Sequence, residues 1–178
     1  MAEAFSNKVA RAAGIVTTMT GGAIGITTNL ITGISTVHVA VNDLVDTGNF
    51  ILGTKVTNIG VSSVTCDRDS TNTAAATNQS VKFLGVTTAY TSTGTKSILV
   101  GGTFANNTTS SVNLTVQVFD NSASSEVGIA AKIPVPSGSS FVITDAGKTV
   151  LESSDEIRIY CDSANAIDAT LSILTGVS

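Results

Sequence analysis

The sequence predicts an all-β protein. Three observations support this prediction: a composition low in charged and aromatic residues, regular alternation of apolar and polar residues, and turn residues where the alternation stops. Only 12% of the 178 residues are charged and 4% are aromatic, and the chain has no Trp. Thr, Ser, Val and Ile are abundant instead, and β-branched residues favour pleated, half-buried strands.

The first element expected is a short amino-terminal helix over residues 3–13. Phe5 and Val9 recur there at the spacing of a helical face, and Gly14 supplies a natural stop. A helix this short is marginal alone and needs a surface on which to dock. We therefore expect residues 1–23 to form a helix and arm, which either caps its own domain or reaches into a neighbouring subunit.

Residues 24–83 are expected to form a small β-module of strands and tight turns. The module contains Asn42 and Asp43 in a turn, followed by the run Asn49-Phe-Ile-Leu-Gly-Thr-Lys-Val-Thr-Asn-Ile-Gly60. This order is similar to a small β-module repeated in tail-fibre and virion proteins of bacteriophages, notably marine contractile-tailed cyanophages. That family often has Gly where this chain has Asn42. Because Asn tolerates the left-handed backbone, the turn is expected to survive the change.

Residues 84–178 are expected to form an antiparallel β-sandwich or jelly roll. The clearest strands are Val112–Phe119 and Glu156–Cys161, in which apolar residues alternate with polar ones, while Pro134 and Gly138 fall where a strand must stop. Short strands at this spacing are typical of sandwiches and jelly rolls. The expected strands lie within Val81–Tyr90, Lys96–Val100, Val112–Phe119, Val127–Val135, Ser140–Thr144, Glu156–Cys161 and Ala169–Leu174.

This carboxy-terminal segment also resembles a known group of proteins. The resemblance is carried by Ile133-Pro-Val-Pro136, Gly147-Lys148, Asp155-Glu-Ile-Arg-Ile159 and the closing strand Ala169-Thr-Leu-Ser-Ile-Leu174. The order looks like the carboxy-terminal pattern of small β-sandwich structural proteins of tailed bacteriophages. The resemblance implies a virion protein that is structural and not enzymatic.

Composition excludes several classes of function. A net charge of −4 supplies no basic field for phosphates, so no nucleic-acid partner is expected. No segment is apolar over a length that would cross a bilayer, and the amino terminus lacks the apolar stretch of a signal peptide. We expect synthesis in the host cytoplasm and no membrane partner. A surface with so few charges favours assembly into something larger.

Residues that could carry chemistry are few. Acting as a base, His38 would need a neighbouring nucleophile, and paired carboxylates could act as in glycosidases, although sugar clefts usually carry aromatic platforms. The two cysteines lie far apart in a chain with no export signal, so both thiols are expected to be buried or half-buried, with a disulfide as the alternative. Two Cys and one His are also too few for a zinc site. We expect no catalytic residue, cofactor or metal. The candidates considered are His38, Asp67, Asp69, Glu152, Asp155, Glu156, Cys66 and Cys161.

The sequence therefore predicts a non-enzymatic virion protein that self-associates and is attached to the neck, collar or tail, in association with fibres. The expected partners are further copies of the chain and other virion proteins. Phe5, Val9 and Ile15 are the expected docking residues, because they form the apolar stripe of the arm. Two alternatives remain: a decoration or cement protein that stabilises the head, and a module that binds host-surface glycan.

Overall fold

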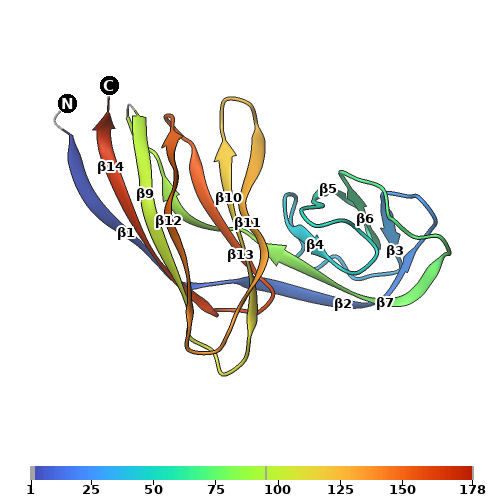
Figure 1. The fold of residues 1–178 in the computed structure, drawn as a ribbon. Coiled ribbons are helices and arrows are strands. Elements are labelled where there is room, and N and C mark those ends of the chain that lie inside the picture. The colour runs from blue at the N-terminus through green and yellow to red at the C-terminus, as the bar shows by residue number, and fades with distance from the viewer. Residues whose placement is uncertain (1–2, 95, 178) are drawn as a thin grey trace. The chain divides into compact units, whose positions relative to one another are not determined.

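The structure is a computed structural model that describes residues 3–94 and 96–177, with the side chains of residues 145–148 left aside. Within those residues every regular element is a β-strand, which confirms the all-β prediction. The chain forms two compact units (Figure 1). The first unit combines Met1–Gly14 with Thr87–Ser178, and the second, Ile15–Val86, is inserted in the chain between those two segments.

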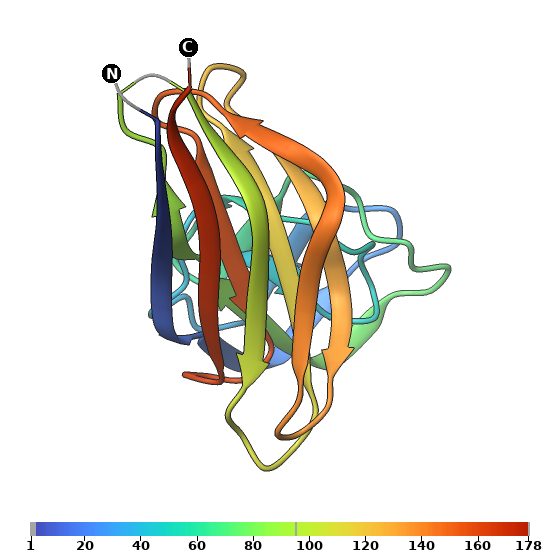
Figure 2. The ribbon, with the colours of Figure 1, turned by 60° about the vertical axis from the view of Figure 1, so that its left-hand side comes forward.

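The first unit is a sandwich of two four-stranded antiparallel sheets. Its strands are β1 (Ala4–Ala13), β8 (Thr87–Thr91), β9 (Lys96–Asn106), β10 (Val112–Asp120), β11 (Ser125–Val135), β12 (Ser140–Leu151), β13 (Glu156–Cys161) and β14 (Ile167–Val177). One sheet has the order β1-β14-β9-β12, and the other has the order β11-β10-β13-β8. Figure 2 shows the first of these sheets in front, with β1 in blue at one border and β12 in orange at the other.

The strands of the sandwich pair in a nested order. The first strand, β1, pairs with the last, β14, and the pairs that follow inward along the chain are β8 with β13, β9 with β12 and β10 with β11. A chain whose first four strands pair in reverse order with its last four, wrapped into two sheets, has the jelly-roll arrangement. Of the two architectures expected for this segment, the strand order therefore identifies the jelly roll.

The core of the sandwich lies between its two sheets. Leu114 and Val116 of β10 point into it from one sheet, and Leu171 and Ile173 of β14 point into it from the other; all four are fully buried. The alternation predicted for Val112–Phe119 therefore sets which face of β10 is buried. Burying each such side chain stabilises the fold by ~1.5–3 kcal/mol.

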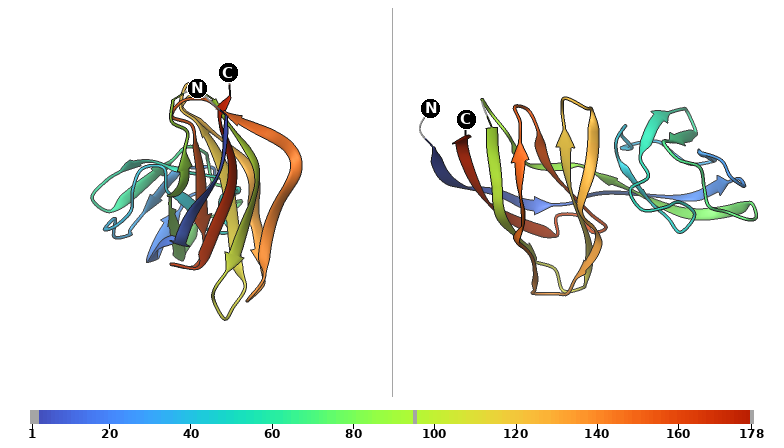
Figure 3. Two further views of the ribbon diagram at one scale, coloured as in Figure 1. Left: turned by 90° about the vertical axis from the view of Figure 1, so that its left-hand side faces the viewer. Right: turned by 45° about the horizontal axis from the view of Figure 1, so that its top comes forward.

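The predicted amino-terminal helix is wrong, because this segment is the edge strand β1. Residues Ala4–Ala10 run antiparallel to residues 169–175 of β14 in unbroken register. β1 and β14 lie side by side in both views of Figure 3. Phe5 and Val9 are four residues apart, a spacing that fits one face of a strand as well as one face of a helix. Main-chain pairing with β14, which lies far along the chain, decides between them.

Gly14 leads from β1 into the second unit and does not end a helix. Its φ of +125° is one that residues with side chains rarely adopt. A Cβ atom at this position would lie 2.4 Å from the carbonyl oxygen of Ser163 and 2.6 Å from Sγ of Cys161. Both the backbone and the space around it therefore require glycine.

The second unit is a six-stranded sheet with its own core. Its strands are β2 (Ile15–Ile24), β3 (Leu30–Thr32), β4 (Leu44–Asp46), β5 (Val56–Ile59), β6 (Ser63–Cys66) and β7 (Ala76–Gly85), in the order β4-β7-β2-β3-β6-β5. The long strands β2 and β7 pair so that Ile15 lies opposite Gly85. Ile24, Ile31 and Phe83 are among the buried residues of this core, which is separate from that of the sandwich.

The turn at Asn42 in the second unit has the left-handed backbone that the sequence predicts, so this prediction is confirmed. Asn42 has a φ of +74°, the left-handed conformation expected for the position before Asp43. The Asp43 carboxylate stabilises the turn by accepting a hydrogen bond of 2.8 Å from the N–H of Ala40. Burial raises the pKa of this carboxyl group above its ordinary value.

The two compact units begin and end at other residues than the segments expected from the sequence. The sequence placed divisions after residues 23 and 83, whereas the compact units change at Gly14 and again at Val86. The segment expected as one helix and arm therefore divides: Ala4–Ala13 form β1, in the sandwich, and β2 of the inserted unit begins at Ile15.

Candidate assembly surface

The outer face of the sheet β1-β14-β9-β12 carries rows of cross-strand neighbours. Phe5 on β1 lies opposite Leu174 on β14, Leu174 lies opposite Ile98 on β9, and Ile98 lies opposite Val150 on β12. Directly opposed residues of an antiparallel sheet share one face, so these four apolar side chains form a row across all four strands. The ends of the row are the most open: Phe5 is 69% exposed and Val150 is 51% exposed.

A second row runs parallel to the first on the same face. Val9 lies opposite Thr170, Thr170 opposite Thr103, and Thr103 opposite Val142. All four are exposed, Val9 to 74%.

Between these rows lies a third, of small and polar residues, formed by Asn7, Ser172, Gly101 and Thr144. None of the residues in the three rows carries a charge. We call these three rows the uncharged face. Because monomeric proteins rarely leave large apolar patches open, a face of this kind is typical of a contact surface.

The structure relates the predicted docking residues to this face. Phe5 and Val9 lie on the same side of β1 and begin the first and second rows. Ile15, which is 54% exposed, belongs to β2 in the other unit and is not part of the uncharged face. The sequence missed the members contributed by β9, β12 and β14. The available signal was the apolar residues on the polar phase of those strands, such as Val142 and Val150.

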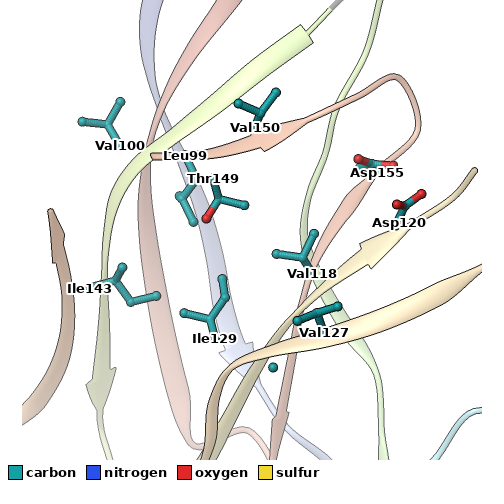
Figure 4. A pocket seen from close by; sticks show the side chains of 11 residues that line it. Leu99, Val100, Val118, Asp120, Val127, Ile129, Ile143, Thr149, Val150 and Asp155 are labelled. Atoms are coloured by element: carbon teal, nitrogen blue, oxygen red, sulfur yellow. The ribbon is translucent and has the colours of Figure 1, made fainter. Parts of the chain in front are cut away.

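An apolar cleft opens beside β9 and β12 (Figure 4). It has a volume of about 510 Å³ and lies against β10 and β11 on its other side. Figure 4 shows Asp120 and Asp155 together at one end of it, apart from Ile129 and Ile143. The lining residues are Leu99, Val100, Val118, Asp120, Val127, Gly128, Ile129, Ile143, Thr149, Val150 and Asp155.

The two carboxylates at the cleft are used to hold turns. Asp155 is only 5% exposed, and its oxygens accept hydrogen bonds from the N–H of Glu152 at 2.8 Å and of Asn121 at 3.0 Å. Oδ1 of Asp120 accepts from the N–H of Ala123 and the hydroxyl of Ser122, which lower the pKa of this carboxyl group. Each carboxylate satisfies backbone donors of a turn, as Asp commonly does.

The three acidic residues among which a glycosidase pair was considered, Glu152, Asp155 and Glu156, have different roles. Asp155 holds a turn as described, and Glu152 lies 3.7 Å from the Lys96 ammonium on the surface. Glu156 accepts hydrogen bonds from Arg158 at 2.7 Å and from the hydroxyl of Thr88 at 3.3 Å. The structure therefore gives each of these carboxylates a partner of its own.

The remaining candidates lie in the second unit. His38, considered above as a base, lies in a turn with a φ of +65°. Asp67 accepts a 2.8 Å hydrogen bond from the N–H of Lys55 and lies 3.7 Å from Arg68. Throughout residues 3–94 and 96–177, no group of three or more His, Cys, Asp or Glu side chains is placed to hold a metal ion.

An ionic cluster occupies the outer side of the other sheet of the sandwich. The guanidinium of Arg158, on β13, binds Glu126 of β11 and Glu156 of its own strand. Its Cζ also lies 3.7 Å from the ring centroid of Phe119 on β10. The Glu126 side chain is only 2% exposed and that of Arg158 is 13% exposed. This cluster ties three adjacent strands together.

Both cysteines are free thiols, and each is buried in a different unit. Burial raises the pKa of Cys66 to about 12 and that of Cys161 to about 11. The thiolate is the reactive form, so raising a pKa from 9 to about 12 lowers its amount about a thousandfold at pH 8.

We therefore expect both thiols to be almost inert in the native protein and fully reactive in denaturant. Burial adds to the effect of the raised pKa, because the reagent cannot reach either sulfur. Colour release from a thiol reagent at pH 8, with and without urea, measures this. Two thiols titrating in the native protein at the rate of free cysteine would contradict it.

Comparison of the chain with protein-family models, curated proteins and solved structures finds no match. The part of the chain that the structure describes contains no helix able to cross a membrane.

Proposed function

We propose that the protein is a non-enzymatic structural subunit of a bacteriophage virion, which associates with copies of itself and is attached at the neck, collar or tail. The observation that carries the proposal is the uncharged face, whose three rows cross a complete four-stranded sheet. A rigid sheet with exposed apolar rows is suited to lie against other proteins.

Two further features support this role. The resemblances in residues 24–83 and 84–178 both lead to virion proteins of tailed phages. The jelly-roll strand order is also used by viral capsid domains, although this is an analogy of fold, and lectins and cupins share it. The acidic side chains once considered for catalysis serve turns and ion pairs, which is in keeping with a structural role.

The test is immunogold imaging of purified particles of the phage that encodes the chain, with copies per particle counted by quantitative mass spectrometry on the same preparation. We expect gold at the neck or tail and a copy number in the tens or fewer. Gold spread over the head with hundreds of copies would replace this position by that of a decoration protein. Particles that contain none of the protein would overturn the virion role altogether.

A further inference from the structure

Four strands form the edges of the two sheets of the sandwich, and they differ in how well they could pair with another chain. β11 carries Pro134, which has no N–H to donate, and β8 is only five residues long. The ladder of β12 is interrupted between Thr144 and Thr149. Bulges, prolines and short length all protect an edge from pairing.

Over Ala4–Ala10, β1 has no proline and no bulge, and the one charge on its inner side is the exposed Lys8. Residues Ala4–Ala10 form a regular ladder with β14, and no other strand pairs with β1 among the described residues. The opposite edge of a paired strand presents a row of main-chain N–H and C=O groups to solvent. β1 is therefore the edge of the sandwich best suited to receive another strand.

The sequence of β1 is complementary to itself when read in the opposite direction around Asn7. In an antiparallel pair of two copies centred on this residue, Phe5 lies opposite Val9. Glu3, just before β1, lies opposite Arg11, which follows the regular ladder at the register shift between Ala10 and Ala13. All four of these side chains are exposed. An aromatic residue opposite a β-branched one, and opposite charges facing each other, are both favourable cross-strand pairs.

Neighbouring registers lose this complementarity. Centring the pair on Lys8 places this ammonium opposite its own copy and sets Phe5 against Arg11. Centring it on Ser6 sets Glu3 against Val9, so Glu3 no longer faces Arg11. Like charges directly opposite each other are destabilising, so the register around Asn7 is the favoured one.

We propose that two copies of the protein pair through β1, antiparallel, across a two-fold axis at Asn7. The two four-stranded sheets then become one sheet of eight strands, and the same patch of each copy contacts the other, as in other two-fold dimers. Because Phe5 of one copy lies opposite Val9 of its partner copy, the apolar rows continue from one uncharged face onto the other. This inference rests on the proposed assembly role, for which it supplies a contact between copies.

Cysteine cross-linking tests the register directly. Opposed residues of an antiparallel pair have Cα atoms about 4.5–5.5 Å apart, within the range that a disulfide spans. In the proposed dimer only position 7 faces its own copy, whereas Ser6 faces Lys8. The native thiols are both buried, and so they do not compete.

The variants are Asn7→Cys, with Ser6→Cys and Lys8→Cys as matched controls, oxidised in a glutathione buffer over a series of protein concentrations. We expect Asn7→Cys to form the covalent dimer at least about tenfold faster than either control, because only its thiols meet. Equal rates, or fastest cross-linking at position 8, would overturn the proposed register. Thermal unfolding of each reduced variant checks that the fold is kept, and a folded Asn7→Cys that stays monomeric overturns the proposal.

Charge exchange provides a second test, which does not depend on oxidation. Arg11→Glu or Glu3→Arg alone places like charges opposite each other twice in the dimer, and we expect the association constant from sedimentation to fall about tenfold or more. The double variant Glu3→Arg/Arg11→Glu, or an equimolar mixture of the two single variants, restores opposite charges at both positions and should restore pairing. If neither the double variant nor the mixture recovers the association constant, the proposed pairing is overturned. If the protein pairs in solution but is absent from phage particles, the virion role is overturned and the dimer stands. If it is found in particles but does not pair through β1, the dimer is overturned and the virion role stands.

Discussion

Gly14→Ala is expected to lower the free energy of unfolding of the sandwich by about 4 kcal/mol. A residue with a side chain is strained by ~1–3 kcal/mol in a sparsely populated backbone region such as φ +125°. Forcing an extra carbon into a packed site costs a further ~1–3 kcal/mol. Here the new atom would meet the Ser163 carbonyl oxygen at 2.4 Å, and a backbone atom cannot simply rotate away.

Two other glycines of the same unit separate the causes. Gly138 has a φ of +66° and open space around it, so Gly138→Ala measures backbone strain alone. Gly128 has open space and an ordinary backbone, so Gly128→Ala should change stability little. The readout is pulsed alkylation in urea, followed by mass spectrometry of the two cysteine peptides. Loss of protection at Cys161, in the sandwich, without loss at Cys66 is the expected result; stability equal to that of Gly138→Ala would contradict it.

Arg158→Met is expected to cost the sandwich about 3–5 kcal/mol, which is the typical loss when one partner of a buried ion pair is removed. Methionine has a similar length, but it takes the guanidinium away from the Glu126 carboxylate, whose side chain is only 2% exposed. The contact with the ring of Phe119 also loses its charge. Urea unfolding followed at Cys161 measures the change.

A double-mutant cycle separates the charge from the packing. Glu126→Gln removes the buried charge, so the double variant Arg158→Met/Glu126→Gln should recover much of the stability lost in Arg158→Met alone. Lys96→Met is a matched control, because its ion pair with Glu152 is exposed on both sides and such pairs contribute ~0–1 kcal/mol. A double variant no more stable than Arg158→Met would show that packing, and not the charge, accounts for the loss.

The sequence predicted the strands that have one buried and one open face. Glu156–Cys161 has the same bounds in the structure, and Val112–Phe119 is one residue shorter than β10. In both, the alternation exists because the inner residues enter the core and the outer ones do not. The pairing order could not be predicted, because it depends on contacts between residues as distant as Ala4 and Thr175.

β1 shows why the amino-terminal segment was misread. Its outer residues Phe5 and Val9 are apolar and exposed, while Lys8 lies on the other side of the strand and is exposed as well. Neither side has the burial that produces a period of two, so the spacing of four was the only pattern left to read. The uncharged face was missed for a related reason. The sequence alone does not distinguish apolar residues that are buried in the core from apolar residues that are exposed on a contact surface.

The pairing of β1 with β14 also sets the order of events during protein synthesis. Of the sandwich strands, the ribosome makes β1 first and its partner β14 last. The sheet β1-β14-β9-β12 therefore cannot be completed until all of these strands have been translated. The inserted unit is continuous over Ile15–Val86 and can fold earlier, while contacts of high sequence separation form late. Nascent chains that still lack β14 therefore cannot present a finished β1 edge to each other. Association through that edge has to wait until β14 has been made and paired with β1.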